Sequence, residues 1–115
     1  MRRRHLQAAF NYASTLVRLQ RCQEAKSLLL KALPVARRAL SENDDLTLRG
    51  RSIYAEALYH DTDASLDDLN EAVTTLEDTV RIARRVMGGA HPTTGWIEET
   101  LQNARAVLRA RETSA

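Results

Sequence analysis

Two stretches of the chain, Glu24–Arg38 (EAKSLLLKALPVARR) and Glu71–Arg85 (EAVTTLEDTVRIARR), carry the same pattern 47 positions apart. Both open on Glu-Ala and close on Ala-Arg-Arg, with a leucine at the matched position between. Further upstream, Tyr12-Ala13 recurs as Tyr54-Ala55 at an offset of 42. Such self-similarity is typical of stacked helix–turn–helix units, each of which needs its neighbour to bury an apolar face. The pattern therefore predicts a helical solenoid.

The spacing of apolar residues divides the chain into helices. Repeats near 3.6 residues predict five of them, over about 3–21, 23–41, 46–60, 66–87 and 92–111. Pro34 lies inside the second and has no amide hydrogen for the Leu30 carbonyl, so we expect a bend there. Gly50 lies inside the third at a cost of about 1 kcal/mol relative to alanine, which close approach of a neighbouring helix explains. Residues 112–115 are expected to form a frayed tail.

Helix boundaries have their own signals. Residues 43–45 (Asn-Asp-Asp) supply N-cap chemistry for the third helix. Ser65 and Asp68 form a near capping box before the fourth, with aspartate in place of the usual glutamate. Gly88 and Gly89 end that helix.

Composition limits the protein's class. The 115 residues are 43% apolar but only 4% aromatic, with one cysteine and a net charge of +2. Abundant alanine and leucine favour an all-α domain over a sandwich, a barrel or a doubly wound sheet. No apolar run reaches the roughly 18 residues that span a bilayer. The small positive charge is weak support for nucleic-acid binding.

The compartment is inferred from the cysteine and the N-terminus. A lone cysteine, Cys22, suits a reducing compartment, and we expect a cytoplasmic protein. Residues 1–23 carry five arginines and no acid on an amphipathic stripe, which is also typical of an organelle transit peptide. Because residues 11–24 lie in the register of the first repeat, a structural first helix is the preferred interpretation.

Short motifs within the units carry a family resemblance. The first unit contains Asn11-Tyr12-Ala13 and Glu24-Ala25, and the second contains Ile53-Tyr54-Ala55 and Glu71-Ala72. The second unit ends in the linker 87–94 (MGGAHPTT). These residues resemble the tetratricopeptide repeat, and more narrowly the long variant found in kinesin light chains. The equivalent first-unit segment, residues 40–45, keeps the length of the linker but lacks its glycine, histidine and proline.

The resemblance implies a fold. We expect one domain over residues 1–115, a right-handed α-solenoid of two repeats (about 3–42 and 45–88) closed by a capping helix (about 92–111). Alanines at matched positions would let paired helices approach closely, and they are Ala13, Ala25, Ala55 and Ala72.

The resemblance also implies a binding site, because first helices of such repeats line a concave groove that holds a peptide. Asn11 matches the family asparagine that hydrogen-bonds ligand backbone. Phe10, Tyr59 and Trp96 would be exposed aromatic anchors. The predicted groove residues are Phe10, Asn11, Ser14, Arg18, Arg49, Ser52, Glu56, Tyr59, Trp96 and Asn103, with Gln7, Val17, His60 and Glu99 beside them.

Other chemistries have little support in the sequence. His5, His60 and His91 lie in different elements, without a second His or Cys at metal-ligand spacing. His60 with Asp61 and Asp63 is the nearest approach to a ligand cluster, and we interpret it as a loop entrance. Cys22 is interpreted as an apolar filler and His91 as a cap of the fifth helix. No nucleophile elbow or phosphate loop is present. The sequence thus predicts no enzyme, no cofactor, no metal and no small-molecule substrate.

Three functions remain open. The first is a protein–protein interaction scaffold that binds a peptide segment of a partner protein. The second is structural self-association, as a homo-oligomer stacked through exposed repeat ends or as the C-terminal part of a longer array. The third is an arginine-mediated nucleic-acid contact, which ranks last.

Overall fold

The computed structural model describes residues 2–114, which form five α-helices and no strand. The helices are α1 (Arg2–Arg18), α2 (Cys22–Leu40), α3 (Asp45–Tyr59), α4 (Leu66–Met87) and α5 (Pro92–Ser114). The prediction of an all-α solenoid is confirmed, and the bounds of α4 are those expected from its apolar spacing.

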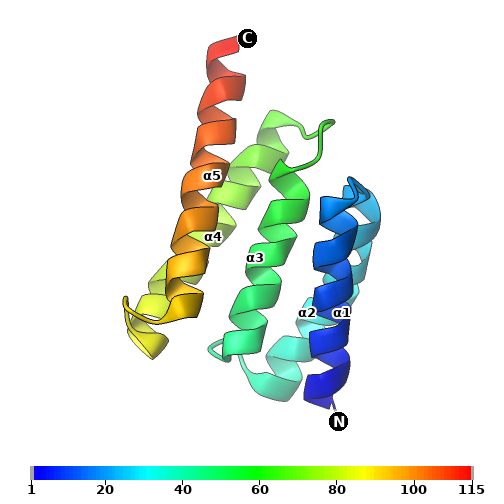
Figure 1. Cartoon of the computed structure of the whole chain (residues 1–115), viewed down its shortest axis with the longest axis vertical. Helices are drawn as coiled ribbons and strands as arrows, with labels where there is room; N and C mark the ends of the chain where they lie inside the picture. The colour runs from blue at the N-terminus through cyan, green and yellow to red at the C-terminus, as the bar shows by residue number, and fades with distance from the viewer. Residues whose placement is uncertain (1, 115) are drawn as a thin grey trace.

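The helices form two layers (Figure 1). In the front layer α1, α3 and α5 lie side by side, with α2 and α4 behind them. α3 packs against the other four helices, whereas the backbones of α1 and α5 make no contact with each other. The molecule measures 46 × 30 × 19 Å along its principal axes. The central position of α3 explains why most of its residues are buried.

The core consists of two clusters of buried side chains, one on each side of α3. The first joins α1 and α2 to one side of α3, and the second joins α4 and α5 to its other side. The four matched alanines of the repeat, Ala13, Ala25, Ala55 and Ala72, are all fully buried. Cys22 begins α2 inside the first cluster, and burial raises the pKa of its thiol. Its interpretation as an apolar filler is confirmed.

The helix starts follow the predicted caps. The Asp44 side chain accepts a hydrogen bond from the Leu46 amide at 2.9 Å. Ser65 and Asp68 form a complete capping box, each side chain accepting from the other residue's amide at 3.0 Å. Nδ1 of His91 accepts from the Thr93 amide at 3.1 Å and so caps α5, as expected.

Two helix ends differ from the prediction. α1 ends at Arg18 rather than Arg21, because Gln20 adopts a left-handed conformation with φ 61°. The amides of Gln20 and Arg21 bond back to the carbonyls of Val17 and Leu16, which is a Schellman motif without glycine. The tail prediction is wrong for residues 112–114, since α5 continues to Ser114; Ala115 lies outside the described residues. α2 continues as one helix through Pro34.

Side-chain burial corrects one further expectation. The apolar spacing of α4 predicts that Leu66 lies on the same inward stripe as Leu69 and Leu76. Leu66 is instead 45% exposed, because it is the first residue of α4 and precedes the turns that pack on the core.

Candidate functional site

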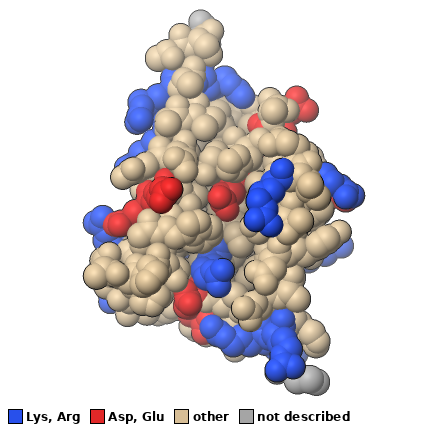
Figure 2. All heavy atoms as spheres, in the orientation of Figure 1, with Lys and Arg blue, Asp and Glu red and all other residues tan. Residues whose placement is uncertain are grey.

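The front layer contains a hollow between α1, α3 and α5. Its volume is about 330 Å³. Figure 2 shows the same face of the molecule, with both acidic and basic side chains on it. The lining residues are Ser14, Val17, Arg18, Gln20, Glu56, His60 and Trp96.

The packing of the layer creates this hollow. α1 and α5 both contact α3 but their backbones do not contact each other, and the hollow lies between them beside the C-terminal end of α3, at Glu56 and His60. The half-buried Trp96 packs against both core clusters. The Trp96 side chain therefore lines the hollow and also packs where the two core clusters meet.

Glu56 is the acidic group of the hollow. Its side chain is half-buried, and it forms no hydrogen bond or ion pair with any other residue in the range 2–114. Burial raises the pKa of the Glu56 carboxyl to about 7. A carboxyl group with a pKa near neutrality is present in two forms at neutral pH. Its neutral form donates a hydrogen bond, and its ionised form attracts a cation.

Arg18 is the basic group of the hollow. Its side chain is exposed, and its Nη2 donates a hydrogen bond to Oγ1 of Thr15 at 3.3 Å. Within the described part of the chain, no carboxylate lies close enough to pair with it. A guanidinium without an ionic partner remains available to a ligand carbonyl or carboxylate.

Tyr59 is the last residue of α3, and His60, its C-cap, lines the hollow. Their rings stack with centroids 4.5 Å apart. His60 is exposed as a whole, yet desolvation lowers the pKa of its imidazole. Burial, followed by the charge of Glu56, raises the pKa of Tyr59 to about 12. Both rings are therefore uncharged at neutral pH.

Three of the predicted groove residues are not exposed. Phe10 is 2% exposed and packs against α3, Ser52 is fully buried and donates to the Leu48 carbonyl at 3.2 Å, and Tyr59 is 6% exposed. The expectation that Phe10 and Tyr59 are exposed anchors is therefore wrong. The cause is α3, which covers Phe10 of α1 at Gly50 and buries its own Ser52 and Tyr59 between neighbouring helices.

The other predicted residues fall into two groups. Ser14, Arg18, Glu56 and Trp96 line the hollow together. Asn11 and Asn103 are exposed and Arg49 is half-buried, but none of the three lines it; neither do Gln7 and Glu99. Gln20 lines the hollow and escaped prediction. Gln20 lies beyond the end of α1, where its left-handed backbone conformation sets the direction of the chain. Helical periodicity does not predict such a turn.

The loop before α4 does not form a metal site. Oδ2 of Asp61 accepts from Nε2 of Gln23 at 2.9 Å, and its Oδ1 accepts from the Asp63 amide at 2.9 Å. Across residues 2–114 there is no group of three or more side chains arranged to hold a metal ion. The Asp61 carboxylate instead links the loop before α4 to Gln23 in the first turn of α2.

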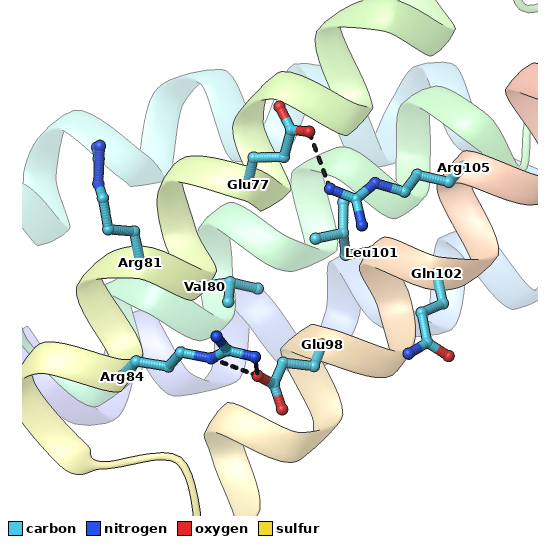
Figure 3. Close-up of a pocket in the computed structure, with 8 residues that line it drawn as sticks. All are labelled: Glu77, Val80, Arg81, Arg84, Glu98, Leu101, Gln102 and Arg105. Atoms are coloured by element: carbon cyan, nitrogen blue, oxygen red, sulfur yellow. Dashed lines mark hydrogen bonds and ion pairs between the residues drawn. The ribbon is translucent and has the colours of Figure 1, made fainter.

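A larger hollow, of about 500 Å³, lies between α4 and α5 (Figure 3). Val80 and Leu101 lie at its centre. Ion pairs Arg84–Glu98 and Glu77–Arg105 join the two helices across it, the latter at 3.0 Å. Because these charges neutralise one another, this hollow offers a ligand fewer free groups than the hollow at Glu56.

Comparison with known families identifies the repeats. A family model described as the tetratricopeptide repeat matches residues 6–45 and 61–93, more than half of the chain. The chain belongs to the tetratricopeptide repeat family. The two matched segments coincide with α1–α2 and with α4 and the linker that follows it. α3, in which Ile53 replaces the expected asparagine, falls between them.

Membership carries a general role. Tetratricopeptide repeats serve as protein–protein interaction scaffolds, so protein partners are expected for this chain. No significant match was found among curated proteins or among solved structures. None of the helices within residues 2–114 is long and apolar enough to cross a membrane.

Proposed function

We propose that this tetratricopeptide repeat protein binds a peptide segment of a partner protein in the hollow between α1, α3 and α5, without catalysing a reaction. The observation that carries the proposal is the pair of unpartnered ionisable side chains, Glu56 and Arg18, on two walls of one hollow beside Trp96. An aromatic side chain and free charged groups in a concave site are typical of a recognition surface.

The wider face extends the proposed site along the helices. Asn11 and Asn103 are exposed on either side of the hollow, on α1 and α5. Side-chain amides both donate and accept hydrogen bonds, so they are suited to the backbone of an extended peptide. We propose that the hollow holds one or two peptide side chains while the flanking amides contact the peptide backbone.

Peptide selection followed by titration tests this function. A random linear peptide library would be panned on the full chain, and the selected peptides titrated against the wild-type protein, Asn11→Ala and Arg18→Ala. We expect both substitutions to weaken binding. Arg38→Ala is the matched control, because Arg38 is an exposed arginine on α2 in the other layer. Equal affinities for all four proteins would contradict groove binding.

The linker supports a narrower classification. Gly88 ends α4 with φ 88°, and His91-Pro92 follow at the start of α5. We infer from this arrangement, and from repeat offsets of 42 and 47 residues, that the repeats are of the long, kinesin light chain-like variant.

A second candidate function is self-association through the N-terminal end of the solenoid. There α1 and α2 leave an open hollow of about 590 Å³, lined mainly by aliphatic side chains: Arg2, His5, Leu6, Ala9, Ala32 and Val35. In a repeat array this face is where a preceding repeat or a second chain stacks. Sedimentation over a concentration series separates the candidates, since a monomer at all concentrations would exclude self-association for this chain.

A further inference from the structure

We propose that the peptide bound in the hollow inserts a basic side chain, lysine or arginine, between the Glu56 carboxylate and the Trp96 indole. This inference rests on the proposed peptide-binding function and specifies the chemistry of the ligand. Three features of the hollow support it: an acidic group without a partner, an aromatic ring beside it, and an opposing wall that carries a positive charge.

The first feature is the missing partner of Glu56. A carboxylate that is partly removed from water is stabilised by a cation and by hydrogen bonds to its oxygens. Nothing in residues 2–114 supplies either to the Glu56 side chain. Most of the other partly buried acids do have a partner, the exception being Asp45, whose Oδ1 also lacks one. Asp78, by contrast with Glu56, forms ion pairs with both Arg51 and Arg81.

The groups that face the hollow do not fill this role. Arg18 on α1 lines the same space but is not within ion-pairing distance of Glu56. His60, one turn along α3, has a lowered pKa and is neutral at physiological pH. Glu99 on α5 is exposed and adds negative charge near Tyr59. Within residues 2–114 no positive charge therefore pairs with the Glu56 carboxylate, and we expect the ligand to supply one.

The second feature is Trp96, which lines the hollow from α5. A cation over an indole face is attracted by the negative face of the ring, and more strongly the more it is desolvated. The alkyl stem of lysine or arginine also packs on an aromatic ring while its head remains at the polar group. The Trp96 ring thus matches the alkyl stem of a basic side chain, and the Glu56 carboxylate matches its charged head.

The third feature is the sign of the opposite wall. Arg18 repels any cation in the hollow, so it confines the basic side chain to the Glu56 side and favours a carbonyl or carboxylate of the peptide on its own side. The hollow thereby distinguishes a peptide with one basic residue in a defined position from a uniformly basic segment.

The test uses the peptides selected on the full chain. We expect a lysine or arginine at a recurrent position, and about a tenfold loss of affinity in Glu56→Gln. Acetylating the peptide lysine should cost a similar factor against the wild type and little against Glu56→Gln, because both changes remove the same interaction. Glu99→Gln, an exposed carboxylate on the same face, is the control and should change affinity less than about twofold.

Charge reversal provides a second test. A peptide with glutamate in place of its lysine should bind Glu56→Lys better than it binds the wild-type protein, with circular dichroism confirming that the variant folds. Unchanged affinity in Glu56→Gln, or additive losses, would overturn the inference. If the selected peptides nevertheless lost affinity for Trp96→Ala and Arg18→Ala, binding in the hollow would stand but the insertion of a basic side chain would not. Failure to select any binding peptide would contradict both proposals.

Discussion

The ring of Phe10 on α1 lies directly against the backbone of Gly50 on α3. A methyl group at Gly50 would come within 2.5 Å of Cζ of Phe10, well inside van der Waals contact. This contact explains both a glycine in the middle of a helix and the burial of a phenylalanine expected on the surface. It also sets how closely α1 approaches α3, and thus the position of the α1 wall of the hollow.

Gly50→Ala should destabilise the protein. Alanine improves helix propensity by about 1 kcal/mol, but overpacking against a buried ring costs about 1–3 kcal/mol. We expect a net loss of roughly 1 kcal/mol in urea unfolding. Gly95→Ala on α5 is the control, because its added methyl group meets nothing within 4 Å and should stabilise instead. A more stable Gly50→Ala variant would contradict the contact.

Ser41→Gly should stabilise the protein. Ser41 ends α2 with φ 96° and ψ 163°, nearly the conformation of Gly88, its repeat equivalent at the end of α4, with φ 88° and ψ 156°. That region costs a residue with a side chain about 1–3 kcal/mol. Part of the gain is offset by the loss of the hydrogen bond from the Asn43 amide to Oγ of Ser41 and by the greater freedom of unfolded glycine. We expect a net gain of about 1 kcal/mol in thermal or urea unfolding.

The reciprocal change, Gly88→Ser, serves as the control. It should destabilise by about 1–3 kcal/mol, because it places a side chain on the same backbone conformation. Opposite effects at the two repeat positions are the expected result. Destabilisation by both substitutions would show that the Ser41 side chain contributes more than the backbone strain costs.

Asp78→Asn should be strongly destabilising. Nη2 of Arg51, a buried residue, donates to Oδ2 of Asp78 at 2.7 Å, while its Nε and Nη1 have no hydrogen-bond partner. Removing the negative charge leaves a buried guanidinium unpaired, which costs about 3 kcal/mol. Glu77→Gln breaks an exposed pair with Arg105 and should cost less than about 1 kcal/mol. Similar midpoints for the two variants in urea unfolding would argue against the importance of burial.

Glu56→Gln should stabilise the protein at pH 8 but not near pH 4.5. The raised pKa of Glu56, about 7 against the ordinary 4.5, means that the folded state holds this proton more tightly than the unfolded state. The resulting stability is present below pH 4.5 and is lost as pH rises through about 7. Glutamine carries no charge, so melting at pH 8 should show a gain on the order of 1 kcal/mol, limited by solvent screening of this half-buried group.

A gain that stayed constant with pH would contradict this account. Glu99→Gln, at an exposed position, is the control and should show only a small change at either pH. Because the variant also probes the proposed ligand contact, stability and peptide affinity are expected to move in opposite directions at pH 8.

The sequence alone determined the helices, their caps and their pairing. These features depend on local patterns: apolar spacing, the Ser65–Asp68 box, His91 before α5, and alanines repeated at matched positions. The family resemblance, rather than a local signal, placed Arg18, Glu56 and Trp96 on one face, because first helices of successive tetratricopeptide units line the same groove.

Only the tertiary structure decided which residues of that face meet solvent. Phe10 and Tyr59 occupy helical positions like those of exposed groove residues, yet both are buried. Phe10 on α1 packs against Gly50 of α3, and Tyr59 is on α3 itself, which lies between two neighbouring helices. Trp96 remains half-exposed because α5 borders α3 on one side only within the front layer. Helical periodicity records the face on which a side chain lies, whereas its burial depends on how many neighbouring helices cover that face.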